Sequence, residues 1–133
     1  MTRYSLDTDT VSAILKKDLA VSYKLRAKIH ANHEIILCPV VYYELRRGLL
    51  DKGATSQKQA LQAFVAALQW FEFNEEIWKA AAEEWARAKK SGAHHKDPDL
   101  LIACHAVHFG AVVVTSNIKH FSQHTEELED WRA

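Results

Sequence analysis

Cysteine and low-complexity sequence are both scarce in this chain of 133 residues, which has two cysteines and no repeat. Cys38 and Cys104 stand in apolar stretches with no neighbouring thiol. We therefore expect two buried, reduced thiols, and the sequence excludes the disulfide framework of a small secreted domain.

Long hydrophobic runs and an excess of either charge are also missing. No run approaches the ~20 apolar residues of a membrane span, and the few residues between Met1 and Asp7 leave no room for a signal peptide. We expect a cytoplasmic protein that does not bind membranes. Basic and acidic side chains number 17 each, so nucleic-acid binding would need a local basic surface.

What the chain does contain is a regular alternation of strand and helix patterns. With 48% hydrophobic residues it can fill one ordinary core, which predicts a single domain over residues 1–133. The patterns predict short strands at 4–6, 34–38, 70–73 and 112–115, and helices at 11–15, 20–31, 39–50, 57–68, 75–90 and 98–109. This order predicts a three-layer α/β/α domain with a central, mainly parallel sheet of four or five short strands.

Four polar residues stand where these elements begin or end. Asp7 follows the first strand, Glu44 lies in the helix over 39–50, Asp99 opens the helix over 98–109, and Asn117 follows the last strand. Because the carboxyl ends of parallel strands share one edge, a single edge can gather all four. Carboxylates so close would repel one another unless a cation neutralised them, and oxygen ligands select Mg²⁺ or Mn²⁺.

Each position also has a simpler explanation. Glu44 lies one helical turn after Val40 and would need a partner on that apolar side, such as Arg46 or Arg47. Asp and Asn are common at helix N-caps and in turns, and such a structural role would explain Asp7, Asp99 and Asn117, as well as the neighbouring Asp9.

Taken together, the segments resemble the PIN-domain nucleases, and most closely the VapC-like toxins of bacterial toxin–antitoxin pairs. The matching segments are Leu-Asp-Thr-Asp at 6–9, Val-Tyr-Tyr-Glu-Leu-Arg-Arg-Gly at 41–48, Asp-Leu-Leu-Ile-Ala at 99–103 and Val-Thr-Ser-Asn at 114–117, the last followed by His120-Phe121. The resemblance covers nearly the whole chain, and the order and spacing of the segments carry it.

This resemblance implies a site and a reaction. The metal-binding acids of the family fall on Asp7, Glu44 and Asp99, and its fourth position is Asn117, whose amide is a weaker ligand that brings no charge. The implied function is a Mg²⁺- or Mn²⁺-dependent endoribonuclease that hydrolyses RNA. Neighbouring groups that would support the ligands or orient water are Asp9, Asp97, Thr115 and Ser116.

Basic residues near the same segments are candidates for contacts with RNA phosphates. They are Arg46, Arg47, Lys96 and Lys119. Such contacts would position single-stranded RNA without reading its sequence, and the alternative for each is a solvated helix surface.

Two further groups have a weaker claim to function. His94 and His95 suggest a zinc or manganese site, but a polar loop explains them more simply. Trp70, Trp78 and Trp85 suggest a platform for stacking bases, but an apolar stripe favours packing in the core or at a protein interface.

The resemblance also implies two protein partners, a second copy of the chain and a small antitoxin. Apolar residues that would serve both contacts are Tyr42, Tyr43, Leu49, Leu50, Ala60, Leu61, Phe64 and Leu68. An antitoxin segment in this groove would place an Arg or Lys against the carboxylates. The alternatives are a catalytically weak PIN-like module that binds RNA or antitoxin, which Asn117 favours, and a stand-alone PIN nuclease with another nucleic-acid substrate.

Overall fold

Five parallel strands form the centre of the computed structural model, which describes residues 1–92 and 96–132. They are β1 (Arg3–Leu6), β2 (Glu34–Leu37), β3 (Gln69–Trp70), β4 (Ala111–Val114) and β5 (Leu128–Glu129), in the order β3-β2-β1-β4-β5. Tyr4 lies between Ile35 on one side and Val112 on the other. Since the chain moves outward from β1 in both directions, the strand order reverses between β1 and β4, and side chains at their carboxyl ends can meet there.

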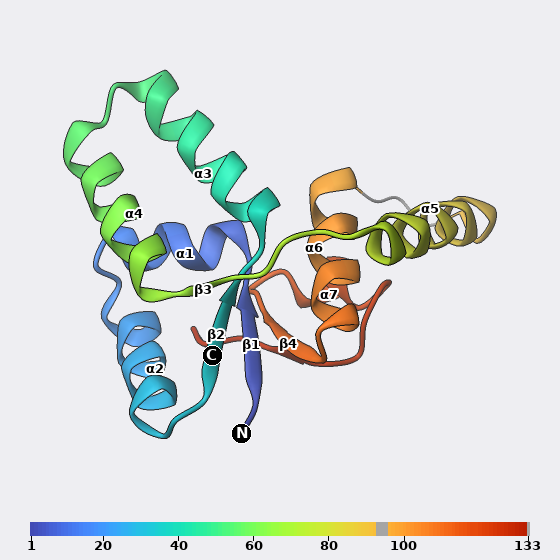
Figure 1. The fold of residues 1–133 in the computed structure, drawn as a ribbon, viewed down its shortest axis with the longest axis horizontal. Helices are drawn as coiled ribbons and strands as arrows, with labels where there is room; N and C mark the ends of the chain where they lie inside the picture. Colours follow the sequence, from blue (N-terminus) through green and yellow to red (C-terminus); the bar gives the residue numbers. More distant parts are fainter. Residues whose placement is uncertain (93–95, 133) are drawn as a thin grey trace.

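Helices cover both faces of this sheet (Figure 1). They are α1 (Thr8–Leu15), α2 (Leu19–His30), α3 (Pro39–Lys52), α4 (Thr55–Ala67), α5 (Glu75–Lys90), α6 (Asp97–His108) and α7 (Ile118–Phe121). Right-handed crossovers place α1 to α4 on one face and α5 to α7 on the other. α2 accordingly contacts β2 and α4 contacts β3, whereas α6 contacts β1 and β4. The predicted three-layer α/β class is confirmed.

Local signals in the sequence explain where the helices begin and end. Pro39 is the first residue of α3, where a missing N–H costs no hydrogen bond. Asn74 caps α5 by accepting a 2.9 Å hydrogen bond from the Ile77 N–H. Gly53 ends α3 in the left-handed conformation, with φ of 64°.

Two elements at the end of the chain were not predicted. α7 and β5 are only four and two residues long, and they lie in or beside the tail that the sequence marks as polar. β5 is held mainly by its backbone, because the Val113 N–H donates to Glu127 O and the Thr115 N–H donates to Glu129 O, each at 2.9 Å. Such short elements carry no periodic signal.

The core is continuous across the sheet. Ile36 of β2 and Ile102 and Ala103 of α6 are at most 1% exposed, which explains why these segments read as nearly unbroken apolar runs. In the described part of the chain, no helix has both the length and the apolar character needed to span a bilayer.

Candidate functional site

The polar segments meet where β1 and β4 end. The Asp7 N–H donates a 3.0 Å hydrogen bond to Val114 O, and the Thr10 hydroxyl donates to the same carbonyl at 3.0 Å, so the start of α1 is tied to the end of β4. α3 and α6 also contact each other, although they lie on opposite faces of the sheet. The result is a cavity of about 220 Å³ whose lining residues are Asp7, Thr8, Asp9, Glu44, Lys96, Pro98, Asp99, Asn117 and Phe121.

Asp7 is the most deeply buried acid of this cavity, with 5% of its surface exposed. It caps α1, because its Oδ1 accepts a 2.9 Å hydrogen bond from the Thr10 N–H. Burial raises the pKa of the carboxyl, and hydrogen bonds from Thr10 and Thr115 partly offset that rise. The N-cap explanation is therefore correct.

Glu44 is held from two sides. Its Oε1 accepts a 2.6 Å hydrogen bond from the Thr8 hydroxyl, and its Oε2 lies 3.8 Å from Arg47 Nη2. Arg47 is itself mostly exposed and lies over the Tyr43 ring, with 5.1 Å between its Cζ and the ring centroid. The ion pair with Arg47 is thus present, but its exposure makes it weak.

Asp99 is half-buried at the start of α6, and its carboxylate interacts with several charged groups. Burial raises its pKa, as does repulsion from Glu44 and Asp9, whereas His120 and Lys96 act in the opposite direction. His120 Nε2 lies 3.5 Å from Asp99 Oδ2. The acids of the cavity therefore affect one another's ionisation across long sequence separations.

Sequence reasoning assigned no role to Thr8 or His120, although both contact the proposed acids. Thr8 stands between two acids in the sequence, and its hydroxyl could have been read as a partner for a carboxylate. His120 follows Asn117 by one turn, and its N–H donates to Asn117 O at 3.1 Å. Nothing in the sequence indicates that α7 turns His120 toward Asp99.

The residues predicted to support the metal ligands or to orient water differ in burial and in their distance from the cavity. Asp9 lines the cavity, whereas Asp97 is exposed and does not. Thr115 is buried, and its Oγ1 accepts a 2.9 Å hydrogen bond from the Asn117 N–H. Ser116 is exposed, and its Oγ lies 3.5 Å from Arg132 Nη1.

The proposed phosphate-contacting residues are divided between two places. Lys96 lines the acidic cavity, whereas Arg46 lines a separate cavity of about 320 Å³ between α3 and α4. Lys119 is exposed on α7 and lines neither. His94 and His95 lie outside the described residues.

The side chains that line the acidic cavity offer the oxygen ligands that a hard divalent cation prefers. Asp7, Glu44, Asp99 and Asn117 offer oxygen ligands, and the acids carry excess negative charge. As the side chains stand, the described residues contain no group of three or more His, Cys, Asp or Glu close enough to hold a metal. Closing around a cation therefore requires the carboxylates to move closer together within the cavity.

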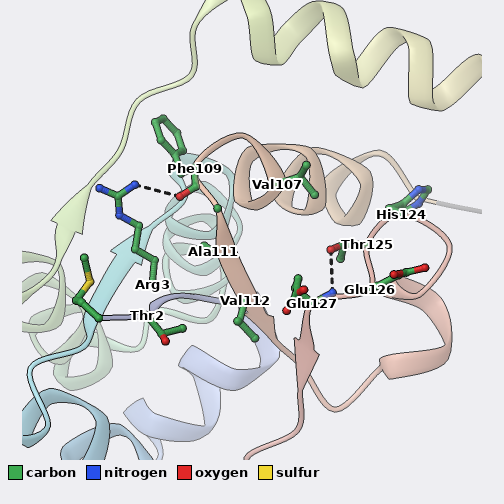
Figure 2. A pocket seen from close by; sticks show the side chains of 12 residues that line it. Thr2, Arg3, Val107, Phe109, Ala111, Val112, His124, Thr125, Glu126 and Glu127 are labelled. Atoms are coloured by element: carbon green, nitrogen blue, oxygen red, sulfur yellow. Dashed lines mark hydrogen bonds between the residues drawn. The ribbon is translucent and has the colours of Figure 1, made fainter.

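A larger cavity, about 840 Å³, lies at the opposite edge of the sheet, beside the start of β4 (Figure 2). Arg3 lines this cavity, but its guanidinium donates to Phe109 O at 3.0 Å and pairs with Glu34. The Thr125 hydroxyl accepts the Glu127 N–H at 3.2 Å. With these groups already bonded to the protein, we assign this cavity no chemistry.

Fold and site together define an α/β domain with a carboxylate-lined cavity at the switch point of a parallel sheet. The PIN domain model matches residues 4–126, and the chain belongs to that family. The predicted resemblance is confirmed.

Similar proteins include ribonuclease VapC1 of Haemophilus influenzae (strain R2866), 28% identical over 96% of this chain and 97% of the relative. Ribonuclease VapC19 of Mycobacterium tuberculosis (strain H37Rv) is 29% identical over 87% and 90%. Among solved structures, VapBC2 of Rickettsia felis bound to a promoter DNA fragment matches with a TM-score of 0.89 and 26% identity over 98% of this chain and 99% of that one. VapBC of Salmonella typhimurium, bound to DNA, has the same fold, with a TM-score of 0.87 at 22% identity over 98% and 99%.

Proposed function

We propose that this protein is a Mg²⁺- or Mn²⁺-dependent endoribonuclease of the VapC kind, the toxin of a toxin–antitoxin pair that acts in the cytoplasm. The observation that carries the proposal is the cavity at the switch point, which is lined by Asp7 just after β1, Glu44 of α3 and Asp99 of α6. Full-length similarity to proteins named ribonuclease VapC supports the reaction class.

In this proposal Asp7, Glu44 and Asp99 hold the cation. A divalent cation there would shield the charge of a phosphodiester and make a water molecule easier to deprotonate. Lys96, at the rim of the cavity, would bind a phosphate oxygen, and the Asn117 amide would orient water or that phosphate. Burial keeps the Asp7 carboxylate in a fixed direction, so the site needs little reorganisation around that ligand.

Cleavage of single-stranded RNA tests the proposal. We expect purified protein to cut in Mg²⁺ or Mn²⁺, EDTA to stop the reaction, and Asp99→Asn to lower the rate by about 100-fold or more. Asp97→Asn is a matched control, because Asp97 is exposed on the same helical turn and does not line the cavity. Circular dichroism confirms that each variant is folded.

The outcomes separate the nuclease from its alternatives. Equal loss in the Asp97 and Asp99 variants, or activity that persists in Asp99→Asn, would overturn the assignment of the site. A folded wild-type protein that binds RNA but does not cut it would favour the catalytically weak module, which Asn117 suggests. Cleavage of DNA in preference to RNA would favour the stand-alone nuclease.

The antitoxin proposal concerns the groove between α3 and α4. Its cavity is lined by aromatic, aliphatic and basic side chains, namely Tyr42, Arg46, Lys58, Leu61, Gln62, Val65 and Trp70. An amphipathic antitoxin segment would bury its apolar side here and extend a basic side chain to the acids. Co-expression with an adjacent small reading frame tests this, and failure to co-purify or to suppress cleavage would contradict it.

We also propose a homodimer. The apolar surface named from the sequence is only partly available for it, because Leu49 and Leu61 are 8% and 2% exposed and pack within the core. Tyr43 and Leu50 are exposed, as predicted for interface residues. The contact surface must therefore be sought from exposure and not from hydrophobicity alone.

A further inference from the structure

His120 lies on α7, a single helical turn that contacts α6, the helix that carries Asp99 (Figure 1). Phe121, the next residue, is 1% exposed and lines the acidic cavity, so it anchors α7 in the core. The backbone N–H groups of His120 and Phe121 both donate to Asn117 O, at 3.1 and 3.2 Å. These contacts fix α7 against the cavity, and with it the direction of the His120 ring.

The His120 ring ends beside Asp99 in a nearly dry position. Its side chain is 21% exposed, and its Nε2 lies 3.5 Å from Asp99 Oδ2. This nitrogen is closed off from solvent and has no hydrogen-bond partner among the described residues. Buried polar atoms are nearly always hydrogen-bonded, because leaving one without a partner is unfavourable. A small movement of the Asp99 carboxylate would supply the partner that this nitrogen lacks.

The three proposed metal ligands differ in how their carboxylates are held. Asp7 Oδ1 accepts a hydrogen bond from the Thr10 N–H at 2.9 Å, and Glu44 Oε1 accepts one from the Thr8 hydroxyl at 2.6 Å. Within the described part of the chain, no hydrogen bond holds the Asp99 carboxylate. A ligand that is free to turn must be ordered when a cation binds, which weakens binding. The unsupported ligand and the unpartnered nitrogen therefore lie side by side.

We propose that His120 is a positioning residue of the metal site, whose Nε2–H donates to Asp99 Oδ2 when a divalent cation is bound and so fixes the direction of that carboxylate. His120 does not line the cavity, so it can support Asp99 without taking the space of the cation. The role requires a ring N–H and no positive charge, since a neutral imidazole still carries one donor. The inference rests on the proposed function, because it takes Asp99 as a metal ligand.

Binding of Mn²⁺ to the metal-free protein, measured by titration calorimetry, tests the role of the ring nitrogen. His120→Phe keeps a ring and removes the donor, and we expect about tenfold weaker binding. His120→Gln places an amide N–H near the position of Nε2, so its affinity should stay within about threefold of the wild type. His108→Phe is the matched control, because His108 is exposed at the far end of the same helix and should leave the affinity unchanged.

The metal requirement of RNA cleavage gives a second measurement. Because His120 acts on cation affinity in this proposal, His120→Phe should raise the Mn²⁺ concentration for half-maximal cleavage by about tenfold. Saturating Mn²⁺ should restore most of the wild-type rate. A residue that only holds the fold together would lower the stability measured in urea and would not favour glutamine over phenylalanine. If the phenylalanine ring disturbs the fold, as shown by circular dichroism, His120→Ala removes the donor without overpacking.

The outcomes distinguish this inference from the proposed function. If wild-type protein binds Mn²⁺ and a folded His120→Phe binds it equally well, the positioning role is overturned and the metal site stands. Equal losses in His120→Phe and His120→Gln would also overturn it, because the ring would then act by packing or as a ligand itself. Wild-type protein that binds neither Mn²⁺ nor Mg²⁺ would overturn the metal site and this inference together.

Discussion

Thr8 and Glu44 are joined by a 2.6 Å hydrogen bond from the Thr8 hydroxyl to Glu44 Oε1. The bond links the first turn of α1 to α3 across 36 positions of sequence, directly beside Asp7. Because a carboxylate that accepts a hydrogen bond loses freedom to turn, Thr8 sets the direction in which Glu44 faces the cavity.

Replacing Thr8 by valine should weaken the site. We expect a loss of about 1 kcal/mol in the free energy of unfolding and roughly tenfold weaker binding of Mn²⁺, because valine keeps the shape and removes the donor. Urea denaturation and titration calorimetry measure the two effects. Thr8→Ser, which keeps the hydroxyl, is the control, and unchanged Mn²⁺ affinity in Thr8→Val would show that Glu44 needs no such support.

Replacing Asn117 by aspartate should strengthen cation binding. One further charge near solvent corresponds to roughly fivefold tighter binding, or about 1 kcal/mol. Titration calorimetry with Mn²⁺ measures this, and Ser116→Asp adds the same charge next door without lining the cavity. Equal gains from both substitutions would indicate a general field effect and no direct role for position 117.

The stability of the metal-free protein should depend on the ionisation of Asp7. Because burial raises the pKa of this carboxyl, the native state holds its proton more strongly than the unfolded chain does. Asp7 therefore lowers stability as pH rises through the interval from its ordinary pKa to the raised one. Asp7→Asn keeps the N-cap, so it should be at least as stable at neutral pH and should lose this part of the pH dependence.

Chemical denaturation across acidic and neutral pH measures this effect. Asp18→Asn, the same change at the N-cap of α2, controls for the altered cap. A lower stability of Asp7→Asn at neutral pH would mean that the Asp7 charge is compensated by the surrounding protein without a cation.

Glu84 should stabilise the packing of α5, and its pH dependence should be opposite to that of Asp7: the contribution of Glu84 is lost as pH falls. Hydrogen bonds from Arg87 first, and then from His124, lower the pKa of Glu84 to about 2. Its contribution is therefore complete above the ordinary value of 4.5 and is lost as pH falls toward 2. Glu84→Gln should cost about 1–2 kcal/mol at neutral pH and approach the wild-type stability in acid.

Denaturation midpoints at neutral and acidic pH test this difference. Glu83→Gln is the control, since Glu83 is the exposed neighbour on the same helix. If Glu84→Gln and Glu83→Gln have the same stability at neutral pH, the network around His124 does not hold α5 in place.

Lys96 should contribute to RNA binding through charge. In an Asp99→Asn background, which prevents cutting, Lys96→Ala should weaken binding of single-stranded RNA and reduce the salt slope by about 0.7. Fluorescence anisotropy over a salt series measures both. The control is Lys90→Ala, because Lys90 is exposed at the end of α5. If the salt dependence of RNA affinity is unchanged in Lys96→Ala, Lys96 does not contact the RNA phosphates.

The sequence determined the order of strands and helices from β1 to β4, because these elements are encoded by periodicity, caps and turn residues within a few positions. Pro39, Asn74 and Gly53 mark boundaries close to those observed. The candidate acids were also found from the sequence, since Asp7 follows a strand, Asp99 opens a helix, and Glu44 lies on an apolar side of its helix where a carboxylate needs a partner. Their convergence followed from the rule that parallel strands share a carboxyl edge.

Tertiary structure alone decided which side chains touch. Arg46 and Arg47 are adjacent in sequence, yet Arg46 lines the α3–α4 groove while Arg47 reaches Glu44. Trp78 lies on an apolar stripe, yet it is half exposed because α6 covers only the neighbouring face of α5. Such outcomes depend on the packing angle between helices, and periodicity specifies the apolar faces of a helix without specifying which of them another element will cover.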